Sequence, residues 1–307
     1  MNKFEEIDYF DKAIDFSDMF SALIKRKVLI VLSTLIAGLI AVFFALSLPN
    51  IYKSNSILAP STTNESLSSQ ISSLSPVASL VGVNLPVGEV PKTYEAIERI
   101  KSFEFFSNHF LPYIKLEDLI AVDKWIPDGN TIIYNNKLYD ESKKEWVRNV
   151  SYPRKKVPSN QEAFREYKRI LDIQIDKNTS FVEISIIHKS PVISKNWLDI
   201  VINNINESMR SIDIDNAQNS IDYLNEYYKS TNVQSLKESI SNLQESQMQT
   251  LMLASSNSDY IFKILDAPYV SERKSSPNRA LICIIITFLG FILSILYILV
   301  IHYSKRN

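Results

Sequence analysis

The chain has 307 residues and a formal net charge of −1, so it lacks the basic excess of a general nucleic-acid-binding protein. Its five glycines are not spaced as in a phosphate-binding loop, which argues against P-loop and dinucleotide-binding enzymes. The single cysteine, Cys283, excludes a disulfide within the chain.

The N-terminal tail is polar and acidic, with apolar interruptions. Six acids lie among its first 18 residues, and Asp15 or Ser17 is suited to cap a short helix there. We expect residues 1–27 to form this tail.

A first membrane-spanning segment follows three basic residues at 25–27. Residues 28–48 carry no charge and reach the ~20 apolar residues that a helix needs to cross a bilayer. A cleaved signal peptide is an alternative, because Ala45-Leu46-Ser47 resembles a cleavage site. The apolar run is longer than a signal core, however, and the region before it is long and acidic.

The next region predicts a strand and then helical segments. Residues 52–59 alternate as a strand does, and the Ser-rich stretch 60–85 is either a packed loop or a short helix broken at Pro76. Residues 93–110 have helical spacing and begin just after Pro91, where a helix start tolerates proline.

Residues 111–157 differ in character from the rest. Asn135-Asn136 separates Thr131–Tyr134 from Lys137–Asp140 and predicts a hairpin, because Asn tolerates positive φ. Seven basic and three acidic residues lie between 137 and 156, with aromatic residues interleaved. This stretch is either a patch that contacts sugar or phosphate or, as we favour, a solvated hairpin with ordinary packing aromatics.

The chain then returns to regular structure. Ser159 and Glu162 form a capping box ahead of a short helix. Residues 171–176 and 181–188 predict a second hairpin.

A long helical stripe begins at residue 192. To Tyr228 it would span ~55 Å, after which it shifts and resumes from Val233 to Ala254. This pattern predicts either two long helices that meet near residues 230–232 or one bent helix. We expect the stripe to need partner helices and to form the contact between copies, through Trp197, Val201, Ile205, Met209, Ile212, Ile221 and Leu224.

The C-terminal region predicts a strand at 260–265 and a second span at 280–303, which follows a lead-in containing Pro268 and Pro277. We expect the four residues after this span to leave no room for a further domain. Gly290 and Ser294 form a small-xxx-small pair, and with Gly38 they are the residues we expect to pack the spans.

The distribution of positive charge predicts the topology. The basic residues at 25–27 favour a cytoplasmic N-terminus, and two spans return the C-terminus to the same side. The expected class is therefore α+β: a membrane hairpin of two transmembrane helices with a mixed α/β extracytoplasmic base domain and a long helical arm. The expected parts are the tail 1–27, the span 28–48, the domain 49–279 (base 49–190 and 258–279, long helices 192–257), the span 280–303 and the tail 304–307.

No catalytic, cofactor-binding or metal-binding residue can be nominated. The three histidines, His109, His188 and His302, have no second ligand at metal-site spacing. Asp213-Ile214-Asp215 resembles the acid pair of nucleotide-sugar transferases. Within a helix, however, residues two apart diverge, which predicts two solvated acids instead.

The whole arrangement resembles the Wzz-type polysaccharide chain-length determinants, also called polysaccharide co-polymerases. Besides the paired end spans, the resemblance rests on residues 14–28, Tyr52–Pro60, 209–224, 243–254, Leu265–Pro268 and Ser276–Arg279. It departs from the family in three places. Ser294 stands where glycine is common, Asn278-Arg279 replaces the usual lysine after Ser-Pro, and the region 111–157 is unusual in length.

The resemblance implies a non-enzymatic protein without cofactors. Such proteins form ring-shaped homo-oligomers in the bacterial inner membrane, with periplasmic helices bundled and both termini cytoplasmic. They set the modal length of O-antigen-type lipopolysaccharide chains made by a separate Wzy-type polymerase. The implied partners are that polymerase, lipid-linked polysaccharide and membrane lipid, with no nucleic acid. The implied juxtamembrane motif is Pro268, Pro277, Asn278 and Arg279.

Three alternatives stay open at this point. A two-span adaptor could activate a separate tyrosine kinase in capsule or exopolysaccharide export. A receptor could sense a periplasmic ligand. A polysaccharide-modifying enzyme would need a pair of acids in a cleft, which the sequence does not offer.

Overall fold

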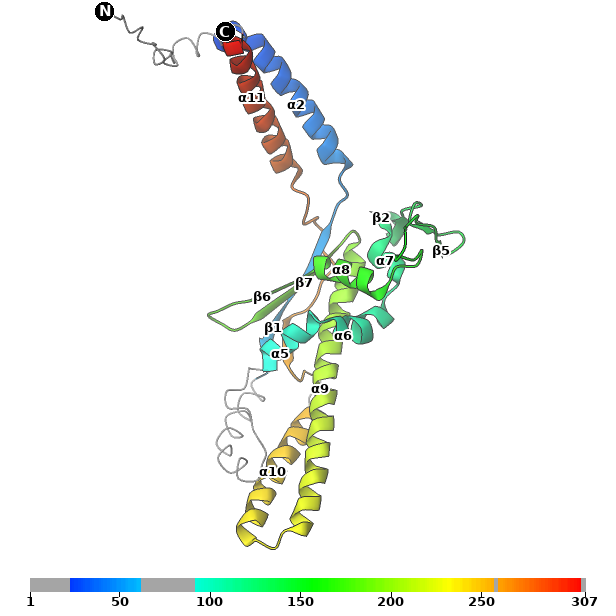
Figure 1. Ribbon diagram of the computed structural model, residues 1–307, viewed down its shortest axis with the longest axis vertical. Coiled ribbons are helices and arrows are strands. Elements are labelled where there is room, and N and C mark those ends of the chain that lie inside the picture. The colour runs from blue at the N-terminus through cyan, green and yellow to red at the C-terminus, as the bar shows by residue number, and fades with distance from the viewer. Residues whose placement is uncertain (1–22, 62–91, 257–258, 305–307) are drawn as a thin grey trace, which may run out of the picture. The chain divides into compact units, whose positions relative to one another are not determined.

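The computed structural model describes residues 23–61, 92–256 and 259–304 (Figure 1). The chain divides into two compact units, one of residues 1–50 and 275–307 and the other of residues 51–274. The expected cap at Asp15 or Ser17 lies outside the described residues. So does nearly all of the stretch 60–85, for which a loop or a short helix was expected.

The first unit is a pair of apolar helices, α2 (Lys27–Ser47) and α11 (Arg279–Ser304), which pack against each other. By length and composition each is able to cross a membrane. Their outward side chains are large, apolar and exposed, as lipid-facing side chains are.

The second unit is built on an antiparallel sheet in the order β6-β7-β1-β8. This confirms the strand expected at 52–59 and the hairpin at 171–188, and the last strand begins two residues later than expected. The strands are β1 (Tyr52–Pro60), β6 (Leu171–Ile175), β7 (Val182–His188) and β8 (Phe262–Asp266). The two outermost in sequence, β1 and β8, are direct neighbours.

The inward side of β1 carries Ser54, Ser56 and Leu58, all fully buried. Both serine hydroxyls are satisfied by backbone carbonyls, that of Tyr269 at 2.9 Å and that of Asp266 at 2.5 Å. Small polar side chains are tolerated in the sheet interior because each finds a hydrogen-bond acceptor.

Two long helices form the arm. The helix α9 (Pro191–Ser230) is capped by Ser190, whose hydroxyl accepts from the N–H of Ile193, and it begins with proline at a permitted position. It ends at Ser230, and α10 (Gln234–Ser256) runs back along its second half. The structure therefore contains two helices rather than one bent helix. Apolar contacts among Leu224, Ile240 and Leu243 join them.

Residues 92–120 form short helices rather than one continuous segment. The break lies at Ser102, which is extended and whose hydroxyl accepts from the N–H of Phe105 at 3.1 Å, so a new helix begins there. The elements are α5 (Lys92–Ile100), α6 (Phe103–Phe105), η1 (Phe106–Phe110), η2 (Leu111–Tyr113) and α7 (Leu116–Ile120).

The hairpin expected around Asn135-Asn136 is wrong. The strand β3 (Thr131–Tyr134) pairs antiparallel with the preceding strand β2 (Val122–Ile126), and the turn η3 (Asp128–Asn130) joins them. The next strand along the chain, β4 (Tyr139–Asp140), pairs antiparallel with β5 (Glu145–Trp146) and not with β3. Gly129 and Asn130 both have positive φ angles, so the reversal between β2 and β3 occurs there.

The capping box is confirmed at α8 (Asn160–Ile170). The Ser159 hydroxyl accepts from the N–H of Glu162 at 3.3 Å, and the Glu162 carboxylate accepts from the N–H of Ser159 at 3.1 Å.

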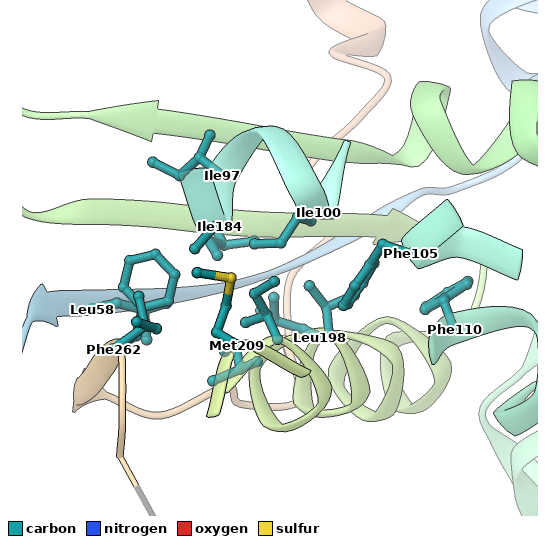
Figure 2. Close-up of a cluster of buried hydrophobic side chains, with 14 of the residues drawn as sticks. Leu58, Ile97, Ile100, Phe105, Phe110, Ile184, Leu198, Met209 and Phe262 are labelled. Carbon is teal, nitrogen blue, oxygen red and sulfur yellow. The ribbon is translucent and has the colours of Figure 1, made fainter. Parts of the chain in front are cut away.

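The core lies between the sheet, the first half of α9 and the short helices. Figure 2 shows side chains from β1, β7, β8, α5, α6, η1 and α9 converging on one apolar cluster. The helix α8 contributes Tyr167 to this cluster. Its side chain is fully buried, and its hydroxyl donates to the carbonyl of Ile100 at 2.9 Å. The labelled members are Leu58, Ile97, Ile100, Phe105, Phe110, Ile184, Leu198, Met209 and Phe262.

Candidate functional site

Small side chains line the contact between α2 and α11. A Cβ atom added at Gly290 would overlap the Cβ atom of Ala37, so only glycine fits there without a shift. Ser294 is also buried, and its hydroxyl donates to the carbonyl of Phe291 at 2.8 Å. Gly38 is less constrained, because an added Cβ would lie at an ordinary 3.6 Å from the Thr287 hydroxyl oxygen.

The sequence reasoning missed the matching stripe on α2. Ala37, Ala41 and Ala45 recur every four residues, and Ala41 and Ala45 are buried. On α11, Ile298 continues the row begun by Gly290 and Ser294 and is likewise buried. The spacing of the three alanines is the signal that would have found this stripe.

The residues expected to form a juxtamembrane motif divide between the two units. Asn278 caps α11, since its side-chain oxygen accepts from the N–H of Leu281 at 3.4 Å. Arg279 donates to the carbonyl of Leu48 at 3.3 Å and to the side chain of Asn50 at 3.2 Å, at the carboxyl end of α2, where a cation is favoured. Pro277 precedes this cap and is half-buried, whereas Pro268 belongs to the second unit and is buried there.

The apolar stripe of α9 is largely covered by the chain itself. Trp197, Val201, Ile205 and Met209 belong to the core. Further along, Ile221 and Leu224 are buried and Ile212 is half-buried. Their role as contacts between copies stays a prediction.

Other apolar side chains on the arm are exposed. Tyr223 stacks on Tyr227 with ring centroids 6.4 Å apart, and Met248 and Met252 on α10 are also open to solvent.

The pair of solvated acids expected at 213–215 is corrected for one member. Asp215 is exposed, but the Asp213 carboxylate binds the Lys92 ammonium at 2.5 Å and accepts from the Tyr260 hydroxyl at 2.6 Å. Burial, with the Asp213 hydrogen bond and charge, raises the pKa of Tyr260 well above its usual value. Asp213 thus joins α9 to α5 and to the approach to β8.

His188 has a structural environment. Its Nδ1 accepts from the N–H of Ser190 at 3.0 Å, so its Nε2 donates to the carbonyl of Asp118 at 3.0 Å and the ring is neutral. Burial lowers its pKa to about 4. His109 stacks on Phe105, and the side chain of His302 lies outside the described part of the chain. Within the described residues, no group of three His, Cys, Asp or Glu side chains could hold a metal ion.

The basic stretch 137–156 separates into structural and exposed side chains. Arg148 is buried and points inward, where it binds the Glu162 carboxylate at 2.6 Å. The Trp125 indole donates to Asn130 at 2.7 Å, and Trp146 packs edge-on against Tyr139. Tyr152, in contrast, is 96% exposed, so this aromatic does not serve packing within the chain.

Residues 12–105 match the family described as Wzz, chain length determinant protein. The resemblance expected from the sequence is thereby confirmed over residues 12–105, which contain α2, β1, α5 and α6. No curated protein sequence matches the chain.

Solved structures also resemble the chain. One is described as a full-length bacterial polysaccharide co-polymerase, with 12% identity, 94% of this chain and 98% of that chain covered, and a TM-score of 0.40. Another is a fragment of WzzB, a polysaccharide co-polymerase from Salmonella Typhimurium, with 13% identity, 74% and 100% coverage, and a TM-score of 0.29.

Proposed function

We propose that this chain is a non-enzymatic regulator of the modal length of an O-antigen-type surface polysaccharide. It acts as a ring-shaped oligomer in the bacterial inner membrane, beside a separate Wzy-type polymerase that extends the lipid-linked polysaccharide. The observation that carries the proposal is the match of residues 12–105 to the chain length determinant family.

The paired helices α2 and α11 support the membrane part of the proposal. Both are able to span a bilayer, and the three basic residues at 25–27 favour a cytoplasmic N-terminus. The second unit, residues 51–274, would then be periplasmic. Small side chains hold the helix pair together, which leaves their large apolar side chains for lipid and for the polymerase.

Such a protein would act through binding alone. A protein without catalytic groups changes product length only by changing how long the polymerase keeps extending a chain before release. The arm offers surface for assembly, because Tyr223, Met248 and Met252 are exposed, and aromatic and Met side chains are enriched in protein interfaces.

The test is deletion of the gene, followed by gel electrophoresis of the surface polysaccharide. We expect the modal cluster of chain lengths to disappear and to return when the wild-type gene is supplied. An unchanged ladder would contradict the proposal. An unchanged ladder with loss of capsule or exopolysaccharide would support the kinase-adaptor alternative. Native mass measurement in nanodiscs would count the copies, and a monomer would contradict the ring.

A further inference from the structure

The second unit carries a surface pocket of about 1040 Å³ that has no part in the proposal above. It forms where residues 153–159 pass the start of α8 and the ring of Phe103. The lining residues on which the argument rests are Phe103, Arg154, Lys155, Asn160, Gln161 and Arg165.

Arg148 fixes one wall of the pocket from behind. Its guanidinium donates to the carbonyls of Lys155 and Lys156 at 2.7 and 2.6 Å, and to both oxygens of the Glu162 carboxylate at 2.6 and 3.3 Å. The Arg148 hydrogen bond holds the pKa of Glu162 below its usual range. The Glu162 charge is therefore neutralised within the wall, and the segment 155–156 is anchored.

The remaining charges of the lining are positive. Arg154, Lys155 and Arg165 line the pocket, against the already paired Glu162. Arg154 makes a long ion pair with Glu162 at 3.7 Å, and its side chain is 61% exposed, so part of its guanidinium is open to a ligand. At the start of α8 the Glu162 N–H is already bonded to the Ser159 hydroxyl, and the N–H groups of Asn160 and Gln161 add to the attraction for a negative group.

The pocket also offers surface for more than an ion. The Phe103 ring is 43% exposed, and Phe164 holds it edge-on with centroids 5.3 Å apart. The amide side chains of Asn160 and Gln161 can both donate and accept, as sugar hydroxyls require. A volume of this size is typical of sites for whole organic ligands.

We propose that this pocket binds a negatively charged saccharide, with Arg154 and Arg165 on its carboxylate or phosphate and Phe103 under a sugar ring. The natural source of that saccharide rests on the proposed function, because a chain-length regulator works beside a growing glycan. Binding of a charged saccharide to the pocket can be tested separately from the regulation of chain length.

The test is calorimetric titration of the full-length protein in nanodiscs. The probes are a uronic-acid oligosaccharide, a phosphorylated oligosaccharide, a neutral oligosaccharide of equal length and inorganic phosphate. We expect saturable binding of at least one charged oligosaccharide, weakened by salt. The double variant Arg154→Gln, Arg165→Gln should reduce its affinity at least tenfold, and Phe103→Ala should also reduce it. Lys143→Gln is the matched control, since Lys143 lies in the same basic stretch but outside the lining.

Three results would overturn the inference: neutral and charged oligosaccharides that bind equally, inorganic phosphate that binds as tightly as either charged oligosaccharide, or unchanged binding in the double variant. The circular dichroism spectrum of each variant verifies folding, and the single variant Arg154→Gln, with its mostly exposed side chain, serves if the double variant misfolds. If deletion of the gene abolishes the modal length but the wild-type protein binds neither charged oligosaccharide, this inference fails and the proposed function stands. If the protein binds a charged oligosaccharide but deletion leaves the ladder unchanged, the proposed function fails and this inference stands.

Discussion

The side chain of Asn206 is hydrogen-bonded to both backbone groups of Phe262. Its oxygen accepts from the N–H of Phe262 at 2.9 Å, and its nitrogen donates to the carbonyl of the same residue at 3.0 Å. The oxygen also accepts from the N–H of Ile261 at 2.9 Å. A single buried amide in α9 therefore fixes where the chain enters β8 after the arm.

We predict that Asn206→Ala lowers the free energy of unfolding by about 3 kcal/mol, because it leaves three buried backbone groups without a partner. Urea unfolding of the detergent-solubilised protein, followed by circular dichroism, measures this. Asn203→Ala is the matched control, since Asn203 is exposed on the same helix and should shift stability by less than about 0.5 kcal/mol. Equal effects of the two changes would contradict the role of Asn206.

Gly290→Leu should push α2 and α11 apart, because even a Cβ atom at Gly290 overlaps Ala37. The distance between spin labels at positions 39 and 289, in a background without Cys283, should increase by about 1–2 Å and broaden. Gly38→Ala should leave it unchanged, since its Cβ meets Thr287 at ordinary contact distance. If both variants give the wild-type distance, Gly290 does not control the helix contact.

We predict that the protein loses unfolding free energy in mild acid because of His188. Its pKa is about 4 in the folded protein against an ordinary 6.5. Between these values the unfolded chain binds a proton that the folded chain does not, so stability falls as the pH drops from 6.5 to 4, by about 3 kcal/mol in full.

The variant His188→Asn isolates this contribution, because Asn keeps an acceptor for the N–H of Ser190 but does not titrate. Between pH 7 and pH 5 the wild type should lose roughly 2 kcal/mol more unfolding free energy than the variant. Parallel pH profiles would show that another group is responsible.

Asp213→Asn should destabilise the contact between α5 and α9 by about 1–2 kcal/mol, because Lys92 loses its charged partner in a half-buried position. Hydrogen exchange of the α5 amides should accelerate. Asp215→Asn, which changes an exposed acid two residues away, should have no such effect. If the α5 amides exchange as slowly in both variants as in the wild type, Asp213 does not stabilise the contact between α5 and α9.

Local signals predicted much of this fold. The strand β1, the hairpin of β6 and β7 and the capping box of Ser159 each depend on neighbouring residues, whose preferences can be read from the sequence. For residues 230–232 the sequence left two alternatives, two helices or one bent helix, and the structure has two helices. The pairing of β3 was missed because two turns competed, and the positive φ angles are adopted by Gly129 and Asn130 rather than by Asn135 and Asn136.

Contacts between distant segments could not be predicted in the same way. The ion pair of Asp213 joins residues 121 positions apart, and the pocket beside α8 depends on Arg148 facing inward. A basic residue in a charged stretch gives no sign of which way it points, so the lining of the pocket became visible only with the fold. The small residues of α2 and α11 were within reach, because their spacing of four is itself a sequence pattern.

The pairing of β1 with β8 leads us to expect that the second unit tolerates length changes in the arm. Pro60 lies opposite Phe262, and the N–H of Ser61 donates to the carbonyl of Ile261 at 2.9 Å, so the two ends of everything in between are held together. Helical turns added in equal number to α9 and α10 would move the tip of the arm without disturbing this junction. We therefore expect that the reach of the arm can be altered without a change in the strands that carry it.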